Sequence, residues 1–135
     1  MNTITKSRID VALRVGVAGL AVANGYIHSQ LGGLLFTANA VGWVVLAVAL
    51  VAPVWPAPQV RFLTRLGLAG FAIATATGWL LVGARYDMGY LSFALDLAIA
   101  AVVVADSLFV DGSPVTIAGK VVRFGAQFVP GAAHA

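Results

Sequence analysis

Four apolar stretches, each about 20 residues long, run through most of this 135-residue chain. A helix of about 20 apolar residues, rising 1.5 Å per residue, spans the roughly 30 Å hydrocarbon core of a bilayer. We place the stretches at residues 9–28, 33–52, 62–83 and 89–110. Because the connections are short, consecutive helices should run antiparallel. The sequence therefore predicts an all-α membrane protein with a four-helix transmembrane domain over residues 1–110.

The composition supports placement in lipid. Hydrophobic residues make up 61% of the chain and charged residues only 10%, with a mean hydropathy of +0.97. A soluble domain carries about 25% charged residues. The net charge is only +3 and the basic residues are spread over predicted helix ends, so the lipid bilayer is the predicted partner and nucleic acid is not. The absence of cysteine excludes disulfides, thiolate metal sites and a cysteine nucleophile.

The sequence contains one internal near-repeat. Residues 14–23 read RVGVAGLAVA and residues 65–74 read RLGLAGFAIA, 51 positions later, with six of the ten residues identical. Each copy begins with an arginine and opens an apolar stretch, which predicts two related helical hairpins in tandem, a parallel repeat. The copy at Arg65 cannot be a signal peptide, so we expect the first stretch to be retained as well.

Small residues occupy matching places in the two copies. Gly19 with Ala23, and Gly70 with Ala74, are pairs of small residues four positions apart. Membrane helices associate where small residues let their backbones approach closely. We therefore predict that the first and third helices cross closely at these residues, near a pseudo-twofold axis along the membrane normal.

The basic residues predict the orientation. In a four-span topology only Arg85 lies on one side, and seven others share the opposite side: Lys6, Arg8, Arg14, Arg61, Arg65, Lys120 and Arg123. Because basic residues collect on the cytoplasmic side, both termini should be cytoplasmic in a multi-pass protein of the bacterial cytoplasmic membrane. Arg14 and Arg65 lie about one turn inside their helices, and we expect both side chains to snorkel to the lipid head groups.

Residues 111–135 form a separate cytoplasmic tail. Ser113 is the expected N-cap and Pro114 the expected first residue of a helix. Apolar residues then recur at steps of three and four: Ile117, Ala118, Val121, Val122, Gly125, Phe128 and Val129. This pattern predicts a short basic amphipathic helix on the membrane surface. Such a helix serves either as a membrane anchor or as a docking surface for a partner.

Several polar residues fall inside the apolar stretches, where each is costly to bury. If they face inward, they form one intramembrane polar cluster in the outer half of the bilayer: Asn24, His28, Asn39, Thr75, Thr77 and Asp96. Arg85, Tyr86 and Tyr90 follow at the adjacent span ends and are expected to rim the mouth of the cluster.

Asp96 is the most informative of these residues. A neutral Asp96 carboxyl group that donates a hydrogen bond to Asn39 or His28 would serve helix packing alone. The alternative is a proton-relay or cation site, because an ionisable residue within a span is a functional candidate. For His28, an interfacial histidine with satisfied hydrogen bonds and a ligand or proton donor both remain open.

The residues offer little for catalysis or for a cofactor. The sequence contains no P-loop, dinucleotide fingerprint or nucleophile elbow, and its two histidines are too few for a metal cluster. His28 is the only histidine within a span, so a bis-histidine haem site would need two subunits. We therefore predict that the protein is not an enzyme and holds no metal and no cofactor.

Two segments carry a resemblance. Residues 28–39 read HSQLGGLLFTAN and residues 89–97 read GYLSFALDL. Together they resemble segments of small four-span membrane proteins of actinobacterial type, in which a histidine and a glycine turn precede Leu-Phe and a polar residue. In that family the acid of the last span is often glutamate, where this chain has Asp96. The resemblance implies the four-span plan and no activity.

Three functions follow as alternatives. The first is a non-catalytic accessory or structural subunit, acting as a homo-oligomer or within a larger membrane complex. The second is a small homo-oligomeric transporter or channel that uses the Asn/Asp cluster. The third and weakest is a haem- or quinone-binding membrane subunit.

Overall fold

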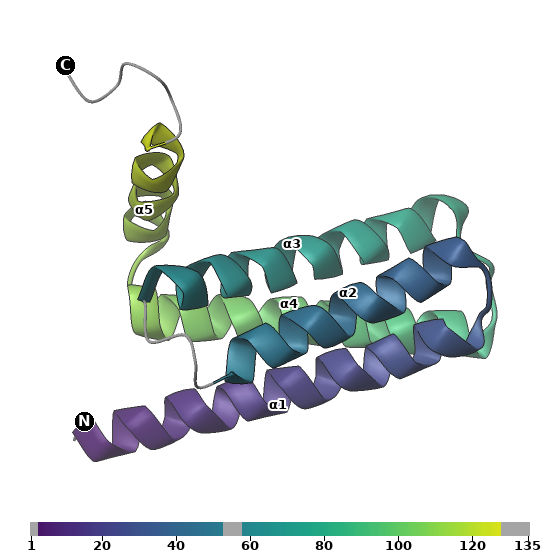
Figure 1. Cartoon of the computed structure of the whole chain (residues 1–135), viewed down its shortest axis with the longest axis horizontal. Helices are drawn as coiled ribbons and strands as arrows, with labels where there is room; N and C mark the ends of the chain where they lie inside the picture. Colours follow the sequence, from purple (N-terminus) through teal and green to yellow (C-terminus); the bar gives the residue numbers. More distant parts are fainter. Residues whose placement is uncertain (1–2, 53–57, 128–135) are drawn as a thin grey trace.

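The computed structural model describes residues 3–52 and 58–127, which form five helices (Figure 1). Their bounds are α1 Thr3–Gln30, α2 Leu34–Val51, α3 Pro58–Val82, α4 Asp87–Asp111 and α5 Pro114–Ala126. The predicted all-α fold is confirmed. The first four helices are long and apolar enough to cross a membrane, which indicates a multi-pass membrane protein.

The four long helices form an antiparallel bundle in which α1 and α3 each pack against α2 and α4 (Figure 1). The start of α1, the end of α4 and α5 lie at one end, which we call the terminal end. The connections at residues 31–33 and 83–86 lie at the other end, which we call the hairpin end.

The predicted close crossing of the first and third helices is wrong, because α1 and α3 occupy diagonal corners of the bundle. The small residues chosen for that crossing all lie exposed on the outer surface: Gly19, Ala23, Gly70 and Ala74. A Cβ atom added to Gly19 or Gly70 would meet no neighbouring helix within 4 Å. The polar face of α1 explains the difference, since Asn24 must turn away from lipid and the small residues beside it then face outward.

Close backbone approach occurs at other glycines. Gly25 of α1 packs on α2, where an added Cβ would lie 3.2 Å from both the Ala40 carbonyl oxygen and the Trp43 Cβ. Gly42 of α2 packs on α3, where an added Cβ would lie 2.7 Å from the Phe71 ring. Small residues therefore bring α1 close to α2 and α2 close to α3, which are not the pairs predicted from the sequence.

The connection between α1 and α2 depends on glycine. Gly32 and Gly33 adopt positive φ angles of 71° and 83°, a conformation that other residues rarely take. They allow α2 to begin at Leu34, directly after the end of α1 at Gln30. So short a connection forces α1 and α2 to be antiparallel neighbours, as the sequence predicts.

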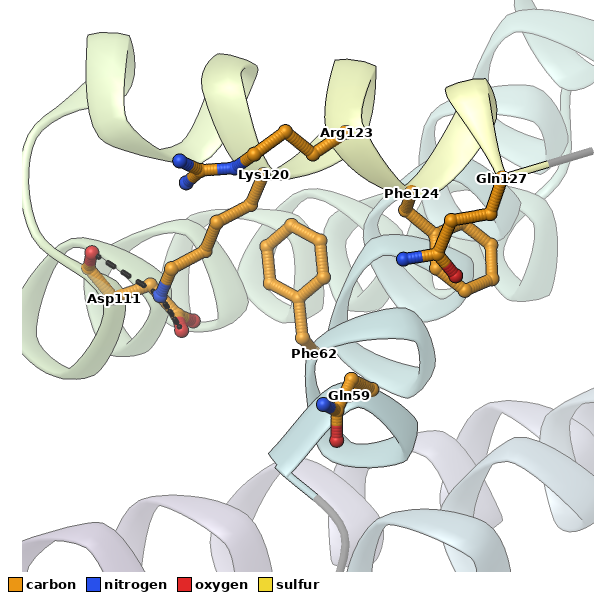
Figure 2. A pocket seen from close by; sticks show the side chains of 7 residues that line it. All are labelled: Gln59, Phe62, Asp111, Lys120, Arg123, Phe124 and Gln127. Atoms are coloured by element: carbon orange, nitrogen blue, oxygen red, sulfur yellow. Dashed lines mark hydrogen bonds and ion pairs between the residues drawn. The ribbon is translucent and has the colours of Figure 1, made fainter. Parts of the chain in front are cut away.

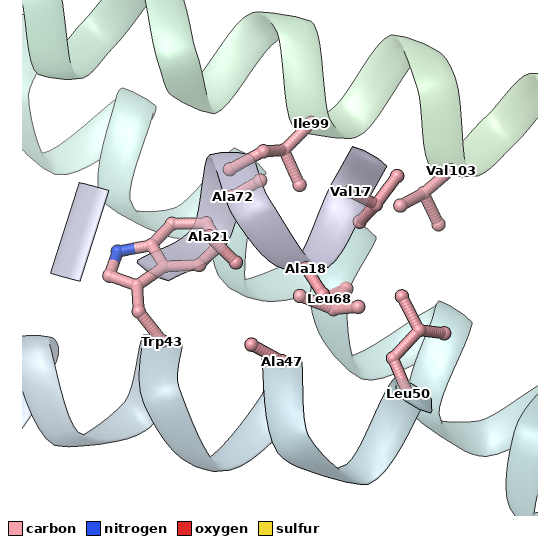
Figure 3. Close-up of a cluster of buried hydrophobic side chains, with 10 residues drawn as sticks. All are labelled: Val17, Ala18, Ala21, Trp43, Ala47, Leu50, Leu68, Ala72, Ile99 and Val103. Atoms are coloured by element: carbon pink, nitrogen blue, oxygen red, sulfur yellow. The ribbon is translucent and has the colours of Figure 1, made fainter. Parts of the chain in front are cut away.

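Ten buried apolar side chains form the core of the bundle, and each long helix contributes some of them (Figure 3). Trp43 of α2 is fully buried and meets the Phe71 ring edge-on, with 4.9 Å between the ring centroids. Leu68 of α3 and Ile99 of α4 are fully buried in the same core. The outer surface is apolar too, with large side chains such as Leu81 exposed, as expected of helices that face lipid.

The predicted tail helix is α5, and its start is confirmed. The Ser113 hydroxyl accepts a hydrogen bond from the Thr116 backbone N–H at 3.4 Å, and Pro114 is the first helical residue. The helix projects crosswise from the terminal end of the bundle (Figure 1). Phe128 and Val129, which are predicted to continue its apolar face, lie outside the described residues.

Candidate functional site

A buried polar network joins α1 to α4 in the hairpin half of the bundle. The Asn24 side-chain amide donates a hydrogen bond to Asp96 Oδ1 at 2.6 Å. The Ser92 hydroxyl donates to Asn24 Oδ1 at 2.7 Å. The amide nitrogen and the amide oxygen of Asn24 thus both bond to α4, and all three residues are buried. We call Asn24, His28, Thr75, Ser92 and Asp96 the hairpin-end network.

The spacing of its members explains this geometry. Asn24 and His28 are four residues apart on α1, and Ser92 and Asp96 are four residues apart on α4, so each pair shares one helix face. The His28 ring is buried, and its Nδ1 lies 2.9 Å from the Asn24 backbone oxygen. Because this contact stays within α1, His28 does not contribute a hydrogen bond to Asp96. Ser92 was missed by the sequence prediction, although its spacing from Asp96 could have revealed it.

The remaining predicted cluster members divide into inner and outer positions. The Thr75 hydroxyl lies 3.0 Å from the backbone oxygens of Phe71 and Ala72 on its own helix, and the side chain faces Asp96. Asn39 is half-buried, and its Oδ1 makes no hydrogen bond with any described residue. Thr77 is exposed on the outer surface, so its place in the predicted cluster is wrong. Side chains two positions apart on a helix point about 200° away from each other, so Thr75 and Thr77 cannot both face inward.

The predicted partner of Asp96 is also corrected. Asp96 bonds to Asn24 rather than to Asn39 or His28, and the amide is the donor. Asn39 lies on α2, whereas the network is built from α1, α4 and the Thr75 turn of α3. The hydrogen-bond partner of the Asp96 carboxyl group is therefore a neutral amide.

The predicted rim residues lie at the hairpin end but gather around Trp79. The Arg85 guanidinium stands 4.3 Å from the Trp79 ring centroid and donates to the Leu80 carbonyl oxygen at 2.7 Å. Tyr90 meets the same indole edge-on at 4.9 Å between centroids, and Tyr86 is exposed in the adjoining turn. The contacts of Arg85 and Tyr90 are thus with the end of α3 rather than with Asp96 or Asn24.

A second network, which the sequence prediction missed, lies at the terminal end. Arg65 is only 4% exposed and reaches three carboxylates on two other helices. Its Nε lies 2.6 Å from Asp106, its Nη2 3.2 Å from Asp10, and its Nη1 3.5 Å from Asp111. The expectation that Arg65 snorkels to the head groups is therefore wrong, because the buried Asp106 and two half-buried acids pair with it inside the bundle.

Two further ion pairs complete this terminal ion network. Half-buried Arg14 pairs with Asp10 at 2.7 Å, one turn nearer the terminal end on α1. Lys120 of α5 pairs with Asp111 at 2.8 Å, which ties α5 to the end of α4. Among the side chains that the structure describes, the network contains three cations (Arg14, Arg65, Lys120) and three anions (Asp10, Asp106, Asp111), whose charges balance.

The acids that flank the apolar stretches were the signal for this network. Asp10 lies near the start of the first stretch and Asp106 near the end of the fourth, so an antiparallel bundle brings them to the level of Arg65. Among residues 3–52 and 58–127, no group of three or more His, Cys, Asp or Glu side chains is arranged to hold a metal ion.

No family model matches the chain, and neither a curated protein nor a solved structure matches it.

Proposed function

We propose that the protein is a non-catalytic integral membrane component, an accessory or structural subunit that assembles with copies of itself or with other membrane proteins. The observation that carries the proposal is the distribution of polar and small residues. The buried polar side chains mostly bond to one another across the bundle, while small-residue stripes on α1 and α3 face outward. The buried polar side chains hold the helices of the bundle together, and the outward-facing small residues offer surfaces for association with other helices.

The outward stripes fit helix association in lipid. On α1 the exposed residues Gly16, Gly19 and Ala23 follow one another at steps of three and four. A Cβ atom added to Gly16 or Gly19 would meet no neighbouring helix within 4 Å, and the same holds for Gly70 on α3. Small-residue stripes of this kind let a partner helix approach closely. Because α1 and α3 occupy diagonal corners, one chain presents two separate association surfaces.

The orientation proposed for the chain places both termini in the cytoplasm of a bacterium. Arg8 and Arg123 lie exposed at the terminal end, and Arg61 lies half-buried at the same end. Arg85 stands alone among the described basic residues at the hairpin end. This asymmetry favours the terminal end on the cytoplasmic side.

The tandem hairpin repeat belongs to the same proposal. It is supported by equivalent arginines, since Arg14 and Arg65 begin the two sequence copies and both enter the terminal ion network. It is also supported by Asn24 and Thr75, which are 51 positions apart, like the two copies, and both lie beside Asp96.

Native mass spectrometry of the protein, extracted from its own membrane in mild detergent, tests the assembly. We expect a complex with copies of itself or with other polypeptides. Gly19→Leu should release a partner at α1, because the added side chain blocks close approach. Ala101→Leu adds a comparable side chain on the exposed surface of α4 and is the matched control. A wild-type protein that is monomeric and free of other polypeptides would contradict the proposal.

A second candidate is a small homo-oligomeric transporter or channel, and Asn39 is the observation that favours it. The buried Oδ1 of Asn39 and the buried Nε1 of Trp43, one turn away on α2, make no hydrogen bond with any described residue. An unpartnered acceptor and donor in the hairpin half of the bundle are suited to a polar solute or to water. Asp96→Asn should then abolish pH-dependent flux in proteoliposomes, and unchanged flux in a working assay would eliminate this candidate.

A further inference from the structure

A cavity of about 260 Å³ lies at the terminal end, between α5 and the start of α3 (Figure 2). Its lining combines two basic side chains, two side-chain amides and two aromatic rings: Lys120, Arg123, Gln59, Gln127, Phe62 and Phe124. Lys120 stands over the Phe62 ring, 5.8 Å from its centroid. The cavity thus offers hydrogen-bond donors and cations beside apolar walls.

One acid, Asp111, also lines the cavity, and its charge is already matched. Asp111 Oδ1 pairs with Lys120 at 2.8 Å, and Oδ2 pairs with Arg65 at 3.5 Å. Arg123 forms an ion pair with none of the acids in residues 3–52 and 58–127. The Arg123 guanidinium therefore remains as a positive charge available to an anion at the cavity.

The other flank of α5 locates this cavity relative to the membrane. An open groove of about 320 Å³ lies there, and apolar side chains such as Leu66, Val104 and Ile117 line most of it. The groove reaches Ala69, further along α3 than the cavity residues Gln59 and Phe62. The helix α5 thus lies between the apolar groove beside the bundle and the polar cavity at its terminal end. In a bilayer, the phosphate groups lie at this border between the apolar core and the polar surface.

We propose that the cavity binds the phosphate group of an anionic phospholipid. The Arg123 guanidinium would bind the phosphate oxygens through paired N–H donors, an arrangement that a planar guanidinium suits better than an ammonium group. The amides of Gln59 and Gln127 donate to the remaining polar oxygens of the head group. The acyl chains extend toward the apolar groove under α5. The inference needs the membrane placement of the chain but not its assembly, so its failure would leave the proposed subunit role untouched.

The test is lipid retention by the full-length protein in mild detergent, measured by native mass spectrometry after addition of phosphatidylglycerol or phosphatidylcholine. We expect one phosphatidylglycerol per chain to be retained in preference to phosphatidylcholine. Arg123→Gln should lower phosphatidylglycerol retention about tenfold, because a charge-assisted contact is lost. Gln59→Leu, which leaves the net charge unchanged, should lower it by a smaller factor. Equal retention of the two lipids by the wild type would overturn the proposal.

Arg8→Gln is the matched control, because it removes the same charge from the same end of the bundle outside the cavity. It should leave lipid retention unchanged. An equal loss with Arg8→Gln and Arg123→Gln would show diffuse electrostatic attraction and would overturn the site.

Competition with glycerol phosphate distinguishes a soluble ligand from a lipid. If glycerol phosphate at millimolar concentration does not displace phosphatidylglycerol, the result supports a phospholipid as the ligand. Displacement by glycerol phosphate that depends on Arg123 would show instead that the cavity binds a soluble phosphate compound.

Discussion

Both polar networks link α1 to α4, but they do so by different chemistry. At the terminal end, three cations and three anions pair around Arg65. In the hairpin half, Asp96 accepts a hydrogen bond from the neutral amide of Asn24, which in turn accepts one from the Ser92 hydroxyl. Depth accounts for the difference: Asp106 is five residues from the end of α4, about 8 Å, whereas Asp96 is nine residues from its start, about 14 Å. Near the head groups both signs of charge are available, and deeper in the bundle short neutral side chains replace them.

Removing the central cation should have the largest effect on stability. Arg65→Met leaves Asp106 buried without a counter-ion and deprives Asp10 and Asp111 of one partner each. Breaking a buried ion pair from one side costs about 3–5 kcal/mol. We expect the free energy of unfolding to fall by that amount in a titration with sodium dodecyl sulfate followed by tryptophan fluorescence.

A double substitution separates the cost of an unpaired charge from a general need for arginine. Arg65→Met with Asp106→Leu removes one cation and one anion, and leaves Asp10 with Arg14 and Asp111 with Lys120. Replacing a buried ion pair by apolar side chains is often neutral or stabilising. Recovery of most of the lost stability is expected. If the double variant is as unstable as Arg65→Met alone, the network is not held by charge balance.

Helix positions were predictable from the sequence, and helix neighbours only in part. The apolar lengths of about 20 residues determine the four spans, and the short connection at Gly32 and Gly33 determines that α1 pairs with α2. Whether α3 then lies beside α1 or diagonally opposite depends on side-chain packing across the bundle. The exposed Gly19 and Gly70 show that a small-residue pattern marks a surface suited to association without indicating which helix, or which chain, occupies it.

The polar cluster was predictable where helical spacing was applied consistently. Asn24, Thr75 and Asp96 do meet, but Thr77 was included against its spacing from Thr75, and Ser92 was omitted despite its spacing from Asp96. The terminal ion network does not follow from the charge asymmetry alone, because that pattern explains the arginines as topology signals and says nothing of the acids at the same level. A buried charge requires a partner, and Asp106 was available to Arg65.

A smaller effect is expected from the amide that bridges α1 and α4. Asn24→Leu keeps the branched shape of the side chain but leaves the Ser92 hydroxyl and the Asp96 carboxyl group without their partner. Leaving a buried polar group unsatisfied costs about 1–3 kcal/mol, less than the loss of Arg65. Thr77→Val on the outer surface of α3 is the control and should leave the free energy of unfolding unchanged. Equal effects of the two substitutions would show that the Asn24 bridge contributes nothing to cohesion.

The smallest effect should come from the acid itself. Asp96→Asn keeps an oxygen that accepts from the Asn24 amide, and it places a new N–H₂ group near the Thr75 hydroxyl, whose oxygen can accept a hydrogen bond. Hydrogen bonds between membrane helices contribute about 0.6 kcal/mol on average, so a change of unfolding free energy within about 1 kcal/mol is expected. The same titration as for Arg65→Met measures it. A loss as large as that of Arg65→Met would mean that Asp96 is held as a charge, and the two networks would then share one mechanism. A small loss would instead allow any change in proton flux in Asp96→Asn to be assigned to the carboxyl group, because the bundle that carries it is still folded.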